Sequence, residues 1–271
     1  MQVQDALALY PLFAFLAVRF AISTAALAPF AWRSLRVLPR EGVVASVGVG
    51  VLLAAAYGFQ TAGLELTTVS STGFITGLYV VFTPFIALAL FRTPVPGAVW
   101  IGVACAVAGL LLLNGAPGGS ALGNALVLAS ALAAGLQIAA MERYAPRHDP
   151  RALTFLQMAV AFVGFVVIAV ALGQVELPRG PTVWGALLVT GVFAGALGYL
   201  VATWVQARTT AARAALLFTL EAPFAALFGV LLADEVLGWP GWLGCAVTMA
   251  GIVLAMPAAS DALRRLLPRR A

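Results

Sequence analysis

The sequence predicts an all-α polytopic membrane protein whose helices form two inverted-topology repeats. Three observations support this fold class. The 271-residue chain is 63% hydrophobic and only 9% charged, with a mean hydropathy of +1.04, whereas a soluble domain carries about 25% charged residues. Its apolar residues also fall into segments long enough to cross a bilayer. Finally, two parts of the chain share a residue pattern at a nearly constant offset.

Nine apolar segments qualify as transmembrane helices, because a spanning helix needs about 20 mostly apolar residues. The breaks between them carry turn-forming Pro and Gly residues, as in Pro94–Gly97 and Pro178–Pro181. The predicted spans are residues 11–32, 42–64, 70–91, 97–114, 122–142, 151–172, 182–207, 211–232 and 239–258.

Arginine predicts the orientation of these spans. All fifteen basic residues are Arg, and positively charged residues favour cytoplasmic loops. Placing the first loop, with Arg33, Arg36 and Arg40, in the cytoplasm puts thirteen of the fifteen on that side, while Arg179 lies outside and Arg19 within a span. We therefore expect a multi-pass protein of the bacterial inner (plasma) membrane with a cytoplasmic C-terminus.

The charge and cysteine content argue against two other classes of partner. The net charge of +5 does not indicate a nucleic-acid partner, because the Arg residues lie in short clusters between apolar runs. The two cysteines, Cys105 and Cys245, lie inside apolar runs, and the only histidine is His148. With neither a CxxC motif nor a Cys/His cluster, we expect no metal site and no cofactor.

The two halves of the chain resemble each other. The matches are Thr83–Leu88 with Ala222–Leu227 at an offset of 139, and Trp100–Gly102 with Trp242–Gly244 and Ala108–Gly109 with Ala250–Gly251 at an offset of 142. In the predicted topology, matching helices cross the membrane in opposite directions, an arrangement that many secondary transporters use. We expect a first repeat over residues 1–119 and a second over residues 120–271, which ends in a short basic cytoplasmic tail.

The first repeat has one span fewer than the second. The partner of residues 122–142 would fall at about residues −17 to 3, so residues 3–7 read as the end of a helix that starts before Met1. We expect the numbering to begin inside the natural chain, whose intact form would have ten spans.

These motifs resemble the EamA-type transporters of the drug/metabolite transporter superfamily, which include YddG-like exporters. Gly73–Val81 followed by Pro84 is similar to their fourth helix, Arg213–Pro223 to the ninth and Trp242–Gly251 to the last. The resemblance covers the chain apart from the first helix. It implies ten helices in two inverted repeats around a central cavity, in a family that exports amino acids and other metabolites. Glu235 matches an acidic residue common after the ninth helix, and its first-repeat equivalent is absent.

Nine polar or aromatic side chains within the spans are candidates to line the substrate cavity, because such groups are costly when they face lipid. Tyr57 with Gln60 and Thr76 with Tyr79 each share a helix face at i, i+3 spacing. The alternative for each is hydrogen bonding or packing between helices, and for Trp204 a position at the membrane interface. The nine are Tyr57, Gln60, Thr76, Tyr79, Gln137, Gln157, Tyr199, Trp204 and Glu221.

Two charged residues, Arg19 and Glu221, lie away from the ends of the predicted spans. Glu221 could contact a substrate ammonium group or couple transport to protons, or it could bond backbone groups loosened by Pro223. Arg19 could attract an anionic group such as an amino-acid carboxylate, or it could snorkel or pair with Asp5. A charge at the centre of a span costs about 2.5–3.5 kcal/mol unless it is paired or neutralised.

Two matched prolines, Pro84 and Pro223, each remove a backbone hydrogen bond within a span. The resulting kinks could act as gates or be permanent curves. Two small-xxx-small pairs, Gly73 with Gly77 and Gly191 with Gly195, predict close helix packing.

Taken with the resemblance, these features predict a secondary transporter, not an enzyme, that moves small metabolites, and amino acids first among them, outward by alternating access through the central cavity. Its partners would be the solute and the lipid bilayer. No nucleotide-binding loop is present, so transport would use an ion gradient or be facilitated. The first alternative is a membrane-embedded enzyme acting on a lipid or prenyl substrate, although Asp234–Glu235 is the only acidic pair. The second is a non-transporting assembly partner.

Overall fold

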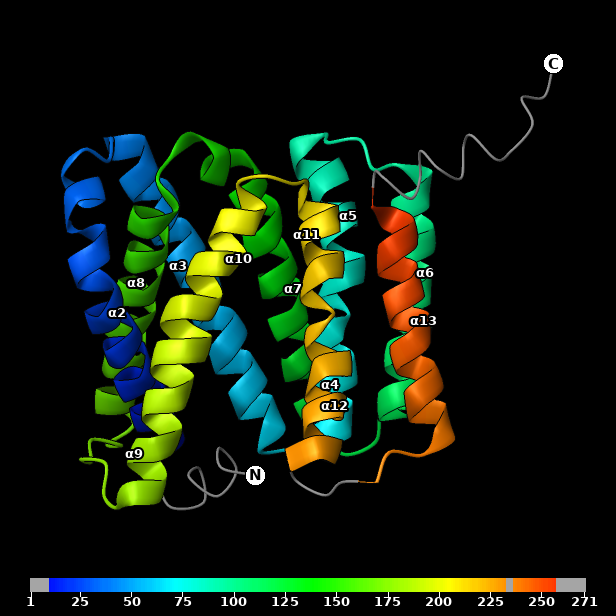
Figure 1. The fold of residues 1–271 in the computed structure, drawn as a ribbon. Helices are drawn as coiled ribbons and strands as arrows, with labels where there is room; N and C mark the ends of the chain where they lie inside the picture. Colours follow the sequence, from blue (N-terminus) through cyan, green and yellow to red (C-terminus); the bar gives the residue numbers. More distant parts are fainter. Residues whose placement is uncertain (1–9, 233–235, 257–271) are drawn as a thin grey trace. The chain divides into compact units, whose positions relative to one another are not determined.

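The computed structural model of the protein describes residues 10–232 and 236–256, and within them it is entirely helical (Figure 1). Over these residues, eight helical segments are long and apolar enough to cross a membrane, and the shorter apolar helix Trp239–Ala255 corresponds to the ninth predicted span. The all-α multi-pass fold is therefore confirmed. Residues 3–7, Asp5, Asp234, Glu235 and the basic tail lie outside the described residues.

Six spans consist of a single α-helix. They are α2 (Leu12–Arg36), α3 (Arg40–Leu64), α6 (Gly97–Asn114), α7 (Ala121–Tyr144, followed by the short 3-10 helix η1, Ala145–Arg147), α8 (Pro150–Ala171) and α13 (Trp239–Ala255). The other three are built from consecutive pieces. They are α4 (Val69–Gly77) with α5 (Tyr79–Phe91), α9 (Pro181–Leu188) with the π-helix η2 (Val189–Gly198) and α10 (Tyr199–Gln206), and α11 (Ala211–Phe218) with α12 (Glu221–Leu232).

Short-range chemistry fixes several helix ends. The Asp149 carboxylate accepts a hydrogen bond from the Arg151 backbone N–H at 2.8 Å, and Pro150 occupies the first position of α8, a combination typical of helix starts. At the end of α5, Arg92 adopts a left-handed backbone conformation with φ of 54°. The chain then enters the proline-containing turn that the sequence predicts.

The helices form two compact units, each with helices from both predicted repeats. Unit 1 comprises residues 1–61 and 140–209, and unit 2 comprises residues 62–139 and 210–271. Unit 1 holds α2, α8 and the α9–η2–α10 span, whereas unit 2 holds α4–α5, α6, α11–α12 and α13. The long helices α3 and α7 each begin in one unit and end in the other.

In unit 1, the matching helices α2 and α8 pack side by side and antiparallel (Figure 1). The Ser34 hydroxyl near the end of α2 donates to the Asp149 carboxylate before α8 at 2.6 Å. Phe13, near the start of α2, stacks on Phe165, far along α8, with ring centroids 6.5 Å apart. The core between them includes the buried side chains of Phe20 and Met158.

The π-helix η2 packs against α2 through glycine. A Cβ built on Gly191 would lie 2.8 Å from Cγ2 of Ile22, and one on Gly195 would collide with the Ser23 hydroxyl. That hydroxyl donates to the Gly191 carbonyl at 2.8 Å. The Gly191–Gly195 pair therefore sits at a close helix contact, as the sequence predicts.

In unit 2, α6 and α13 cross at direct backbone contact and run in opposite directions (Figure 1). A Cβ built on Gly102 would lie 2.7 Å from the Gly251 carbonyl oxygen, and one on Gly109 would lie 2.6 Å from that of Gly244. In the sequence repeat, Gly102 matches Gly244 and Gly109 matches Gly251. Gly102 thus meets Gly251, the repeat equivalent of Gly109. Gly109 in turn meets Gly244, the repeat equivalent of Gly102.

A contact in which each residue meets its partner's equivalent is what a two-fold axis produces. Here the axis is a pseudo-symmetry axis that relates two antiparallel helices of the same chain, so the two-repeat architecture is inverted at this contact. The inverted-topology fold class is confirmed.

Candidate functional site

The predicted cavity residues are divided between the two units. Unit 1 holds Tyr57, Gln60, Gln157, Tyr199 and Trp204, and unit 2 holds Thr76, Tyr79, Gln137 and Glu221 together with Pro84 and Pro223.

In unit 2, both proline-containing spans are interrupted along their length. The first is broken at Leu78, between α4 and α5, and the second at Thr219 and Leu220, between α11 and α12. A proline ring clashes with the carbonyl four residues earlier, which for Pro223 is that of Thr219. The break before Pro84 lies six residues upstream, where the backbone N–H groups of Val81 and Phe82 both donate to the Leu78 carbonyl. Hydroxyl groups bond the carbonyls nearby.

Those hydroxyls belong to threonines beside each break. The Thr83 hydroxyl donates to the Tyr79 carbonyl at 2.7 Å, and the Thr219 hydroxyl donates to the Leu216 carbonyl at 2.6 Å. Such hydroxyl bonds to the carbonyl three or four residues earlier are local to each helix. A threonine therefore adds one side-chain hydrogen bond beside each break.

Tyr79 and Glu221 occupy corresponding places at these breaks. Tyr79 is the first residue of α5 and Glu221 the first residue of α12. A carboxylate at the start of a helix interacts favourably with the helix dipole. Unit 2 therefore places two of its predicted site residues at the starts of half-helices that follow an interruption.

The other two candidates in unit 2 lie on neighbouring segments. Thr76 is one helical turn before Tyr79, near the end of α4, and is half-buried. Gln137 lies on α7 and is buried. Two residues before it, Gly135 packs against α5, where a built Cβ would lie 3.1 Å from Cβ of Phe82. Both Thr76 and Gln137 interact with other groups.

In unit 1, Arg19 lies among aromatic side chains that we call the Arg19 cluster, comprising Arg19, Phe20, Tyr57 and Tyr199. The Arg19 guanidinium carbon is 5.0 Å from the centroid of the Tyr57 ring and 5.9 Å from that of Phe20, within range of a cation–π interaction. The Tyr199 hydroxyl donates to the Tyr57 hydroxyl at 3.2 Å. Phe20 meets the Tyr57 ring edge-on at 5.3 Å.

Tyr57 and Tyr199, both predicted cavity residues, hydrogen-bond to each other. Their contact was not predicted from the sequence.

The remaining candidates in unit 1 make contacts that fit packing or interface positions. Gln157 is fully buried, and its amide nitrogen donates to the Leu153 carbonyl at 3.3 Å. Trp204 is 51% exposed and lies under the Arg208 guanidinium, 3.9 Å from the ring centroid, near the end of α10. Gln60 is half-buried on α3, one turn after Tyr57.

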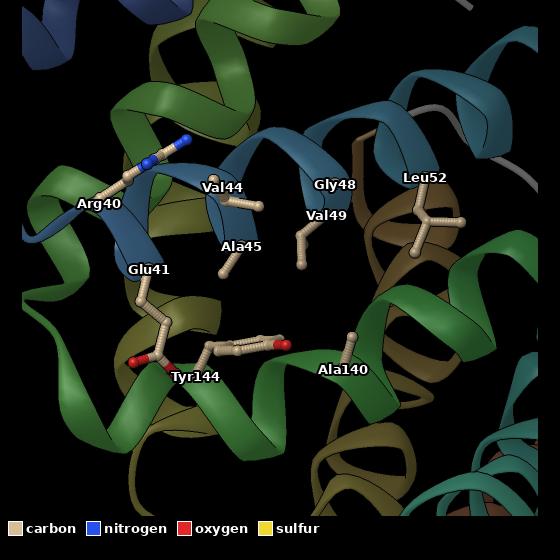
Figure 2. Close-up of a pocket in the computed structure, with 9 residues that line it drawn as sticks. All are labelled: Arg40, Glu41, Val44, Ala45, Gly48, Val49, Leu52, Ala140 and Tyr144. Carbon is tan, nitrogen blue, oxygen red and sulfur yellow. The ribbon is translucent and has the colours of Figure 1, made fainter.

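A cavity of about 550 Å³ lies between the first turns of α3 and the end of α7 (Figure 2). Its lining is mainly aliphatic, and no predicted site residue contributes to it. Figure 2 shows Arg40 and Glu41 extending in different directions at its end, with Glu41 on the side of Tyr144. Glu41 pairs with exposed Arg147 at 3.5 Å. The lining residues are Arg40, Glu41, Val44, Ala45, Gly48, Val49, Leu52, Ala140 and Tyr144.

A second cavity of about 700 Å³ lies in unit 1 between the start of α8 and α10. Trp204 is the one predicted site residue that lines it, along with Asp149, Arg151 and Arg208. Both cavities are therefore beside charged helix ends, whereas the interrupted helices and the Arg19 cluster lie within the spans.

Comparison with known proteins assigns the family. Residues 1–115 and 121–256 both match the EamA-like transporter family. A protein of Archaeoglobus fulgidus named as an uncharacterized transporter is 31% identical over 244 residues, which cover 89% of this chain and 76% of the relative. A solved crystal structure has the same fold, with a TM-score of 0.81 at 18% identity, over 96% of this chain and 92% of the other. The chain belongs to the EamA-like transporter family.

Proposed function

We propose that this transporter moves amino acids outward across the bacterial inner membrane by alternating access. The observation that carries the proposal is the pair of interrupted helices in unit 2, with Tyr79 and Glu221 at the first residues of α5 and α12. Interrupted helices in secondary transporters present polar backbone groups to a solute within the membrane. Glu221 adds a carboxylate suited to the ammonium group of an amino acid.

The carboxylate of Glu221 supports an amino acid as the solute class. A charge at the centre of a span costs about 2.5–3.5 kcal/mol. A role in binding an ammonium group would explain why the chain carries this carboxylate.

We assign the other polar candidates on the strength of their surroundings. In unit 2, Thr76 and Gln137 would contact the solute beside the interrupted helices. In unit 1, Tyr57, Gln60 and Tyr199 would contact the solute near Arg19. The contacts of Gln157 and Trp204 favour packing and interface roles. Pro84 and Pro223 would preserve the interruptions before α5 and α12. These two spans could then bend at the interruptions during the transport cycle.

Counterflow in proteoliposomes tests the proposal. The purified protein is reconstituted and tested with labelled amino acids, nucleosides and cationic drugs, in the wild type and in Glu221→Gln. We expect amino-acid exchange in the wild type and a loss of at least tenfold in Glu221→Gln, with unchanged expression and reconstitution. The matched control is Glu65→Gln, which removes a carboxylate from an exposed position in unit 2 and should leave exchange intact.

Two results would count against the proposal. Exchange of nucleosides or drugs without amino acids would refute the solute class. Wild-type rates in Glu221→Gln would reduce Glu221 to a structural role at the start of α12.

A further inference from the structure

We propose that the Arg19 cluster is a carboxylate-binding subsite that selects solutes carrying one negative charge. The inference rests on the proposed transport function and adds the group by which unit 1 recognises the solute.

The first observation is that Arg19 is a charge without a counter-ion among the described residues. It lies seven residues into α2, or about 10 Å along the helix axis at about 1.5 Å per residue. The other described charged residues of unit 1 lie in loops or near helix ends. Within residues 10–232 and 236–256 the one recorded ion pair joins Arg147 to Glu41. An anion beside Arg19 must therefore come from outside the described part of the chain.

The second observation is that two groups of the cluster offer hydrogen-bond donors. The Arg19 Nε–H is buried and has no acceptor among the described residues. The Tyr57 hydroxyl accepts a bond from Tyr199, so its own proton remains available for donation. The backbone carbonyl of Arg19 already accepts from the Ser23 hydroxyl at 3.0 Å. An anionic acceptor fits these two donors.

The third observation is that aromatic rings contact the Arg19 guanidinium, at cation–π distances of 5.0 Å for Tyr57 and 5.9 Å for Phe20. A planar guanidinium forms two parallel hydrogen bonds with a carboxylate. The rings therefore restrict the Arg19 side chain within the cluster, where a carboxylate can pair with it.

The charge count selects a carboxylate over a phosphate. The one guanidinium neutralises a single negative charge, and the phenol adds a hydrogen-bond donor. A phosphate monoester carries up to two at neutral pH, and the second would stay uncompensated in a weakly polar environment. The chemical class that fits is a monocarboxylate, including the α-carboxylate of an amino acid.

A comparison of carboxylates with their amides tests the subsite. The probes are the twenty L-amino acids and their α-carboxamides, measured singly by counterflow in the wild type, Arg19→Gln, Arg19→Lys and Tyr57→Phe. We expect the wild type to prefer the carboxylate by at least tenfold over the amide. Arg19→Gln should lose most of this preference, Arg19→Lys should keep part of it, and Tyr57→Phe should reduce it several-fold.

The matched control is Arg179→Gln, which removes an exposed loop arginine from the same unit and should keep the full preference. Thermal unfolding of each variant separates loss of selectivity from loss of folding. An equal carboxylate preference in folded Arg19→Gln and the wild type would overturn the proposal.

The test also separates this inference from the proposed function. If the wild type carries no amino acid, the amino-acid proposal fails, and benzoate and lactate are then compared with benzamide and lactamide in the same vesicles. An Arg19-dependent preference for the two acids would support the subsite on its own. Absence of such a preference would refute it.

Discussion

Replacing Gly109 with Ala should force α6 and α13 apart and destabilise unit 2. The built Cβ at this position lies 2.6 Å from the Gly244 carbonyl oxygen, which is 0.8 Å short of the 3.4 Å where ordinary contact begins. The obstacle is backbone, so no side-chain rotation can relieve it. Overpacking of this kind costs about 1–3 kcal/mol.

Replacing glycine with alanine also has an opposing, stabilising effect on the helix, and a second variant measures this effect separately. Replacing Gly with Ala inside a helix stabilises it by about 0.5–1 kcal/mol, because glycine loses more conformational freedom on folding. Gly48 lies inside α3, and a Cβ built there meets nothing within 4 Å. Gly48→Ala is thus the control that reports helix propensity alone.

The assay is thermal unfolding of the purified protein in detergent. At about 2–4 °C per kcal/mol, Gly109→Ala should unfold several degrees below Gly48→Ala. Gly244→Ala should show a similar loss, because its built Cβ lies 2.6 Å from the Gly109 carbonyl oxygen. The double variant should lose less than the sum of the two, since one helix separation relieves both clashes. A midpoint for Gly109→Ala equal to that of Gly48→Ala would refute direct backbone contact between α6 and α13.

Two further predictions concern unit 1. Asp149→Ala should destabilise the protein by about 2 kcal/mol, because it removes both the cap of α8 and the acceptor for the Ser34 hydroxyl. Asp149→Asn should retain most of the stability. An equal loss of stability in both variants, measured by thermal unfolding, would contradict this account. The Tyr10 hydroxyl donates to the Glu176 carbonyl at 2.6 Å, and burial, followed by the nearby Glu176 charge, raises the pKa of Tyr10. The contribution of the Tyr10 hydroxyl to stability is therefore complete below pH 10 and is lost as the pH rises through the raised pKa. Tyr10→Phe should weaken this loss of stability at alkaline pH. A stability profile between pH 9 and 12 that is the same in the variant and the wild type would argue against this role.

The sequence predicts the spans of this protein better than its side-chain contacts. Apolar length and turn residues locate every span within the part of the chain that the structure describes, because the bilayer sets a length that the chain must meet. The repeat also relates Gly102 and Gly109 to Gly244 and Gly251, although their contact between α6 and α13 was not predicted. These features depend on local composition and spacing alone.

Other features depend on how each helix is rotated, which composition hardly reports. In a membrane, both the lipid-facing and the buried positions are apolar, so hydrophobic periodicity distinguishes them poorly. Gln157 is an example. From the sequence its amide could face either a polar path or a neighbouring helix, and the structure buries it against the end of α7. The π-helix containing Gly191 and the break at Leu78 were not predicted, because both require knowledge of the packing partner. The break at Thr219 could have been predicted from Pro223, because a proline ring clashes with the carbonyl four residues earlier.

Counterflow by the purified wild-type protein is the most direct test of the central claim. Vesicles preloaded with an unlabelled amino acid should accumulate the same labelled amino acid transiently and saturably. Replacing Glu221 with Gln should remove that accumulation while the protein remains folded. Label entry no faster than in protein-free vesicles, for every amino acid and with reconstitution verified, would contradict the account.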